Sequence, residues 1–201
     1  MLLGLAFWGL VLSRGPLLRA AGAGLVAEDH LSHADVIVIT IDAGAAGVLE
    51  ASDLVHSGIA SRVAIFVDEP DAVDREFMRR GFHYEDQSEV WRRMLESLGV
   101  TNIQRISRPA SGTEAEGRLL PDWCLQQHYD SVVVVTTSDH SRRVRRVLKR
   151  AMDGRAIKVM VRPARFSSFD SNRWWQSREG LRVGIVEWQK LLLDFVRHPL
   201  Q

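Results

Sequence analysis

A histidine and an arginine follow the most uniformly apolar stretch of the chain. In the sequence VVVVTTSDHSRRV, the apolar stretch ends in Thr136 and Thr137. His140 and Arg143 come next, three residues apart, so on a helix they are neighbours on one side. An imidazole can donate or accept a proton near neutral pH, and a guanidinium can hold a phosphate or a carboxylate. The pattern indicates either a site for a phosphate-bearing ligand or an internal network of ion pairs, and both interpretations stay open.

The apolar spacing after Ser138 predicts that His140 and Arg143 lie in the first turn of a helix, with Ser138 or Asp139 as its cap. A positive charge there opposes the helix dipole and costs about 0.3–1 kcal/mol when exposed. An anion over the helix start offsets this cost. That anion is either a phosphate ligand or one of four acids, namely Asp42, Asp139, Glu114 and Glu116. We expect the other basic residues of the helix, Arg142, Arg145, Arg146, Lys149 and Arg150, to form a solvated side.

In the ligand interpretation, each type of side chain has a defined part. His140 donates a proton or contacts the anion, Arg143 clamps the phosphate, and Glu116 orients the imidazole. The site then has two catalytic candidates, His140 and Glu116. The expected ligand contacts come from Asp42, Gly44, Ser111, Thr113, Thr136, Thr137 and Arg143.

A second segment rich in hydroxyl groups, RPASGTEAE, precedes another helical pattern. Ser111 or Thr113 is suited to cap that helix, and Ser111 with Glu114 has the spacing of a capping box. Capping is the favoured interpretation of these residues taken alone. No GxSxG motif supports a nucleophilic serine.

The segment DAGAAG, Asp42 to Gly47, follows an expected strand and begins an expected helix. It resembles a GxGxxG fingerprint in which Asp42 replaces the first glycine, and Asp68 stands where a ribose-binding acid is expected. A carboxylate at Asp42 would repel a pyrophosphate. We therefore favour close packing of helix and strand over a dinucleotide site, with Gly44 as a position where backbone can approach a ligand.

Composition and charge narrow the function classes. The net charge is +1, from 26 basic and 25 acidic residues, which argues against a general nucleic-acid binder. Cys124 is the single cysteine, so an internal disulfide is excluded. The seven histidines have no spacing typical of metal ligands, and we expect no metal site. Glu187 and Lys190 fit an i,i+3 pair with no further role.

Apolar runs alternate with helical patterns over most of the 201 residues. This alternation is typical of one doubly wound α/β domain with a mainly parallel sheet. In such sheets, ligands bind outside the carboxyl ends of the strands, where the candidate residues above lie. The expected strands are residues 35–41, 62–68, 102–107, 130–137 and 157–163.

The chain begins with an apolar segment, LLGLAFWGLVLS, before Arg14, Pro16 and Arg19. We divide the chain into this hydrophobic segment, residues 1–28, and the α/β domain, residues 33–201. The segment is interpreted as a membrane anchor, with a signal peptide or a helix packed on the domain as alternatives. The protein is then associated with a membrane, or cytoplasmic if the segment packs on the domain.

Several segments together resemble one family. They are LSHADVIVIT, PASGTEAEGRLL, VVVVTTSDHSRRV and RWWQSREGLRVGIVEWQKLL, and their order and spacing are similar to the YdcF-like family of SanA/ElyC-type domains of unknown function. The most specific match is a strand followed by Thr136, Thr137, His140 and Arg143. A looser one comprises Ser111, Thr113 and Glu116, and Glu187 with Lys190 matches a closing E-x-x-K. The first helix, AAGVLEAS, departs from the pattern because it lacks a basic residue.

The resemblance implies a Rossmann-like three-layer α/β/α sandwich at the bacterial inner membrane, with a link to the cell envelope and peptidoglycan biosynthesis. It also implies S-adenosylmethionine as a possible cofactor. We expect a protein that binds, or acts on, a phosphate-bearing small molecule or a lipid-linked precursor, and no nucleic acid. The alternatives are a nucleotide or S-adenosylmethionine binder, with Asp68 on the ribose, and a non-catalytic module tethered to a membrane.

Overall fold

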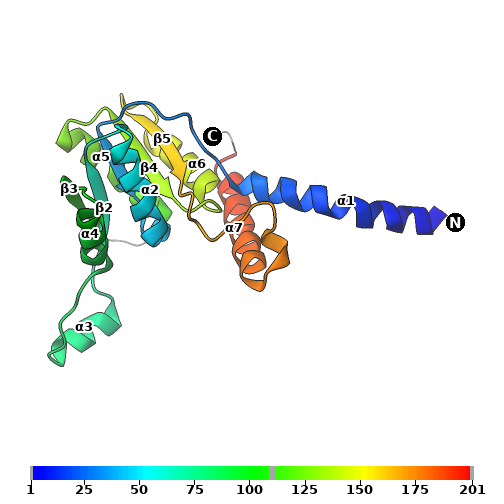
Figure 1. The fold of residues 1–201 in the computed structure, drawn as a ribbon, viewed down its shortest axis with the longest axis horizontal. Coiled ribbons are helices and arrows are strands. Elements are labelled where there is room, and N and C mark those ends of the chain that lie inside the picture. The colour runs from blue at the N-terminus through cyan, green and yellow to red at the C-terminus, as the bar shows by residue number, and fades with distance from the viewer. Residues whose placement is uncertain (1, 109–111, 200–201) are drawn as a thin grey trace.

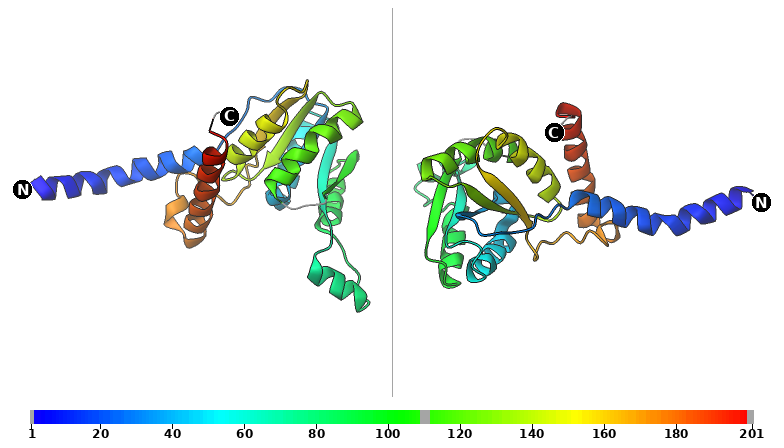
Figure 2. Two further views of the ribbon diagram at one scale, coloured as in Figure 1. Left: turned by 180° about the vertical axis from the view of Figure 1, so that it is seen from behind. Right: turned by 90° about the horizontal axis from the view of Figure 1, so that it is seen from above.

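The computed structural model describes residues 2–108 and 112–199, with side chains from residue 14 onward except at residue 108. In these residues, an all-parallel sheet of five strands runs in the order β3-β2-β1-β4-β5. Helices cover both faces of the sheet (Figures 1 and 2). The strands are β1 (Val36–Ile39), β2 (Val63–Asp68), β3 (Ile103–Arg108), β4 (Ser131–Thr136) and β5 (Lys158–Pro163). The structure thus confirms a Rossmann-like three-layer α/β/α sandwich with a parallel sheet.

The central strands β1 and β4 are buried on both faces, as their β-branched sequences predict. Their register places Ile39 beside Val135, and the backbone N–H of Thr40 donates to the carbonyl oxygen of Val135 at 3.0 Å. Thr40 and Thr136 therefore leave the sheet side by side at its carboxyl edge.

Two helices pack on each face of the sheet. On one face, α2 and α4 cover the side chains of Ile37 and Ile39. On the other face, α5 and α6 cover the side chains of Val132 and Val134. The helices are α1 (Leu2–Leu25), α2 (Gly44–His56), α3 (Ala72–Arg79), α4 (Gln87–Ser97), α5 (Thr113–Gln127), α6 (Ser141–Ala151) and α7 (Arg178–Arg197), with short 3-10 helices η1 (Ile41–Ala43) and η2 (Trp174–Gln176).

Close packing of α5 on α6 brings the starts of these two helices together. A β-carbon at Gly117 of α5 would lie 2.5 Å from Cγ1 of Val147 on α6. Glycine at this position therefore permits the short distance between the helices.

The third apolar cluster joins α1 to α7. It contains Leu25, Phe169, Trp174 and Leu191, all buried. The indole of Trp174 also donates to the carbonyl oxygen of Leu18 at 2.8 Å. The last turns of α1 are thus packed on the domain, whereas the N-terminal end of α1 points away from it (Figures 1 and 2).

Among the residues that the structure describes, none of the helices combines the length and the apolar character that crossing a bilayer requires. Trp174 belongs to the third apolar cluster, where its buried ring packs between α1 and α7.

The start of α6 differs from the sequence-based prediction. Neither Ser138 nor Asp139 occupies the N-cap position, which belongs to His140 and has no side-chain cap hydrogen bond. Instead, the hydroxyl of Ser141 donates to the carbonyl oxygen of Ser138 and accepts from the backbone N–H of Ala27, both at 2.8 Å. The segment that follows α1 therefore forms a hydrogen bond with the hydroxyl of Ser141 at the start of α6.

Candidate functional site

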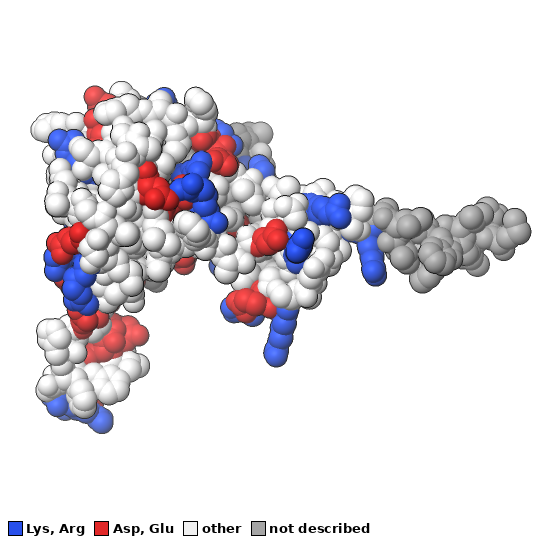
Figure 3. All heavy atoms as spheres, in the orientation of Figure 1, with Lys and Arg blue, Asp and Glu red and all other residues white. Residues whose placement is uncertain are grey.

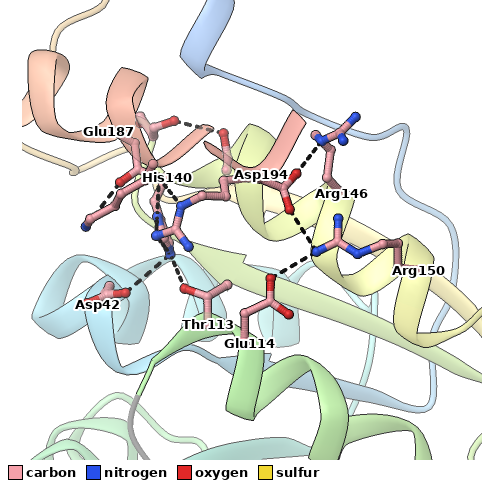
Figure 4. Close-up of polar contacts among 12 residues, drawn as sticks. Asp42, Thr113, Glu114, His140, Arg146, Arg150, Glu187 and Asp194 are labelled. Atoms are coloured by element: carbon pink, nitrogen blue, oxygen red, sulfur yellow. Dashed lines mark hydrogen bonds and ion pairs between the residues drawn. The ribbon is translucent and has the colours of Figure 1, made fainter. Parts of the chain in front are cut away.

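His140 lies at the junction of three helices, and its side chain is buried, with 3% of the residue exposed. Its Nδ1 atom lies 2.8 Å from Oε1 of Glu187 on α7. Its Nε2 atom lies 2.8 Å from Oγ1 of Thr113, the first residue of α5 (Figure 4). A hydroxyl, an imidazole and a carboxylate are therefore joined in one chain of contacts, which is the arrangement that allows a histidine to move a proton.

Asp42 approaches the same imidazole from η1, on the side opposite to Glu187. Its Oδ2 atom lies 3.3 Å from Nε2 of His140, and 59% of its side chain is exposed. The imidazole thus lies between a buried carboxylate and an exposed one (Figure 4).

The guanidinium of Arg143 is directed into this cluster. Its Nε donates to Oε1 of Glu187 at 2.5 Å, and its Nη2 lies 2.9 Å from Nδ1 of His140. In the structure it holds Glu187 and His140, as the interpretation as an internal ion-pair network describes. The role of Arg143 as a phosphate clamp stays a prediction.

The tautomer of His140 decides the direction of proton transfer. When Nδ1 carries the proton, it donates to Glu187, and Nε2 accepts from the hydroxyl of Thr113. When Nδ1 accepts from Arg143, the proton is on Nε2, and the lone pair of Nδ1 faces the Oε1 atom of Glu187 at 2.8 Å. Because an ionised Glu187 repels that lone pair, the neighbours of the ring favour the form with the proton on Nδ1.

Glu187 stays ionised at neutral pH. Burial raises the pKa of this carboxyl group, but hydrogen bonds and charges from His140 and Arg143 outweigh burial and lower it from 4.5 to about 2. The ammonium group of Lys190 adds a weaker contact at 3.4 Å. By contrast, burial raises the pKa of Asp139, the residue before His140. Glu187 is therefore the fixed negative charge of the site.

A second ion-pair network binds α6 to α7 beside the first. Nε of Arg146 lies 2.5 Å from Oδ2 of Asp194, and Nη2 of Arg150 lies 2.8 Å from Oδ1 of the same residue. Arg150 also contacts Glu114 of α5 at 2.9 Å (Figure 4). The prediction of a solvated basic side for these arginines is wrong, because α7 lies over them and supplies Asp194.

Arg142 and Arg145 are also engaged, at the end of the N-terminal segment. Arg142 donates to the carbonyl oxygen of Val26 at 2.8 Å, and Arg145 forms an ion pair with Asp29 at 2.5 Å. Most of the basic residues of α6 thus connect this helix to α7 and to the segment that follows α1.

The chain matches no model of a known protein family, and no curated protein matches it. Membership of the YdcF-like family therefore stays a prediction from the resemblance described above.

Glu116, the residue expected to orient the imidazole, is buried on α5, and this role stays a prediction. The carboxylate that the structure places at Nδ1 of His140 is that of Glu187. The reason is that α7, which is distant in sequence, crosses the start of α6. The sequence feature that pointed to Glu187 is its i,i+3 spacing from Lys190, and this contact is present. Glu187 also contacts His140 and Arg143.

The candidate threonines make different contacts in the structure. Thr113 does not cap α5, since the N-cap residue is Gly112 and the hydroxyl contacts His140 instead. Thr136 is fully buried, and its Oγ1 has no hydrogen-bond partner within the described part of the chain. Thr137 contacts the carboxyl group of Asp139. Ser111, the remaining candidate, lies outside the described residues.

The DAGAAG turn packs tightly. A β-carbon at Gly47 would lie 2.5 Å from Cβ of Ala43 and 2.8 Å from Cγ2 of Ile39, so this glycine permits close contact between α2 and β1. Gly44 has φ of 55°, a conformation that favours glycine. The packing interpretation accounts for this turn, and Asp42 is directed at His140.

S-adenosylmethionine stays a prediction from the resemblance, and Asp68 as a ribose contact stays a prediction from its spacing after the DAGAAG segment. Within residues 2–108 and 112–199, no group of three or more His, Cys, Asp or Glu side chains is placed to hold a metal ion.

Proposed function

We propose that this protein is a YdcF-like protein of the bacterial cell envelope that binds a phosphate-bearing small molecule or a lipid-linked precursor at the carboxyl edge of its sheet. The observation that carries the proposal is the chain of contacts from Thr113 through His140 to Glu187, with Asp42 on the open side. In this proposal, His140 donates a proton to the ligand or accepts one from it.

The ion pairs assign parts to the residues around the imidazole. Glu187 is ionised and fixes the orientation of His140, while Arg143 balances the charge of Glu187. A ring N–H of His140 is a hydrogen-bond donor for a phosphate oxygen. Thr113 adds a hydroxyl at the start of α5, and the start of a helix favours anions. Arg143 and Glu187 are therefore positioning residues.

The envelope part of the proposal rests on the start of the chain. The first turns of α1 carry the sequence LLGLAFWGLVLS, and this end of the helix points away from the domain (Figure 1). An apolar helix in this position supports association with a membrane.

The test is binding to purified full-length protein, measured by calorimetry with inorganic phosphate and with farnesyl phosphate as a lipid-phosphate mimic. We expect His140→Gln to weaken the binding of both ligands at least tenfold. The matched control is His128→Asn, at an exposed histidine with φ of 58°, which asparagine tolerates. Equal affinities in the wild type and in His140→Gln contradict the proposal. Binding of S-adenosylmethionine or adenosine in place of either phosphate compound supports the nucleotide alternative.

A further inference from the structure

The outward side of α7 is apolar. Gly184, Glu187, Leu191 and Asp194 form its buried side, which faces the domain. The opposite side carries four large aliphatic residues spaced by four, seven and four positions, so they form one line along the helix. Their exposed fractions are 38% for Leu181, 49% for Ile185, 55% for Leu192 and 78% for Val196.

Exposed basic residues outnumber exposed acids on α7, although Arg182 forms an ion pair with the exposed Glu179. All four basic residues of α7 are exposed, namely Arg178, Arg182, Lys190 and Arg197. Of its three acids, Glu187 and Asp194 are buried in ion pairs, and only Glu179 is exposed. Arg14 and Arg19 of α1 are exposed as well. Lys and Arg side chains project from this end of the molecule (Figure 3).

The helix α1 crosses α7 and is fixed to it. The indole of Trp188 donates to the carbonyl oxygen of Ala21 at 3.2 Å. A β-carbon at Gly24 would lie 2.8 Å from the ring of Trp188, so glycine permits this close crossing. In Figures 1 and 2, α7 runs across the direction of α1 in every view. A bilayer that takes up the apolar start of α1 therefore meets α7 along its side.

We propose that the outward side of α7, formed by Leu181, Ile185, Leu192 and Val196, docks on the surface of a bilayer that contains anionic lipids. Apolar residues on one side with lysine and arginine beside them are typical of helices that lie in the membrane interface. Anionic lipids attract the exposed basic residues. The inference rests on the envelope part of the proposed function.

The charge pattern favours a bilayer over a second copy of the chain. A symmetric contact between two α7 helices would bring the basic residues of both copies together, and like charges destabilise such a contact. An anionic bilayer surface has the complementary charge. Docking also has a consequence for the site, because Glu187 lies on the inner side of the same helix. The site is then about one helix diameter, roughly 10 Å, from the lipid headgroups.

The test uses full-length protein with a fluorescent NBD label on a single introduced cysteine. The variant is Leu192→Cys, and the matched control is Leu125→Cys on α5, where the leucine is 50% exposed. Native Cys124 does not compete for the label, since it is fully buried and burial raises the pKa of its thiol to about 12. Vesicles of phosphatidylcholine and phosphatidylglycerol are added. The emission wavelength of the label and the rate at which dithionite reduces it are measured with and without the vesicles.

With vesicles, we expect a blue shift and a several-fold slower reduction for the label at position 192, and neither change at position 125. If the protein floats with the vesicles and the label at 192 remains as reactive as the control, the inference is overturned while the envelope proposal stands. If the protein does not bind vesicles at all, both fail. Protection of position 192 without vesicles, together with a doubled mass in solution, assigns the surface to a second copy and also overturns the inference.

Discussion

The substitution Glu187→Gln removes the fixed charge of the site and leaves its shape unchanged. In the wild type, the pKa of Glu187 is lowered from 4.5 to about 2 because His140 and Arg143 hold its ionised form in spite of burial. Each tenfold change in a proton dissociation constant corresponds to about 1.4 kcal/mol, so the folded state gains about 3 kcal/mol from this carboxylate. We expect the variant to lose stability of about this size at pH 7.

The pH dependence gives a second result from the same variant. A carboxyl group with a lowered pKa in the folded state stabilises the protein above its unfolded pKa and loses this effect as the pH falls. The contribution of Glu187 is therefore complete above about pH 5 and is lost between about pH 5 and pH 2. Below that range, the wild type and Glu187→Gln are expected to have equal free energies of unfolding.

The assay is urea unfolding followed by circular dichroism at pH 7, 5 and 3. The matched control is Glu179→Gln, because Glu179 lies on the same helix but is exposed and forms an ion pair with Arg182, which is exposed as well. This control is expected to keep the stability of the wild type. Two results would refute the reasoning: a free energy of unfolding for Glu187→Gln within 0.5 kcal/mol of the wild type at pH 7, taken here as about the size of an ordinary surface effect, or an unchanged slope of stability with pH.

Three further variants test other contacts. Arg143→Gln leaves Glu187 without its guanidinium, so we expect a loss of about 3 kcal/mol in urea unfolding and acid unfolding at a higher pH. Thr136→Val replaces a buried hydroxyl that has no hydrogen-bond partner among the described residues, and the free energy of unfolding is expected to stay equal or to rise by up to about 1 kcal/mol; a clear loss indicates a partner. Gly47→Ala is expected to cost about 1–3 kcal/mol by overpacking, whereas Gly15→Ala, with no atom within 4 Å of the new carbon, costs nothing.

The sheet and part of the site follow from local sequence. The strands β1 and β4 are runs of valine and isoleucine, which only a sheet covered on both faces buries completely. The contact of His140 with Asp42 and Thr113 follows from one rule, since segments after parallel strands meet at the carboxyl edge. These parts depend on neighbouring elements, whose order along the chain is visible in the sequence.

The rest of the site depends on where α7 lies. Glu187 and Asp194 reach α6 only because a helix more than 40 residues away in sequence crosses it. The spacing of residues along the chain does not predict where α7 crosses α6. The sequence therefore does not predict that the acids of α7 form ion pairs with Arg143 and Arg146. The prediction that Ser138 or Asp139 caps α6 is wrong for a related reason. The hydroxyl at the start of α6 is that of Ser141, and it accepts a hydrogen bond from Ala27, in the segment after α1.

The most direct test of the central claim is nuclear magnetic resonance of the seven histidines, labelled with nitrogen-15, before and after farnesyl phosphate is added. The account predicts that one imidazole, removed by His140→Gln, shows a protected ring proton whose signal changes in Glu187→Gln and shifts when the phosphate compound binds. A His140 signal that is the same in Glu187→Gln and insensitive to the phosphate compound contradicts the account.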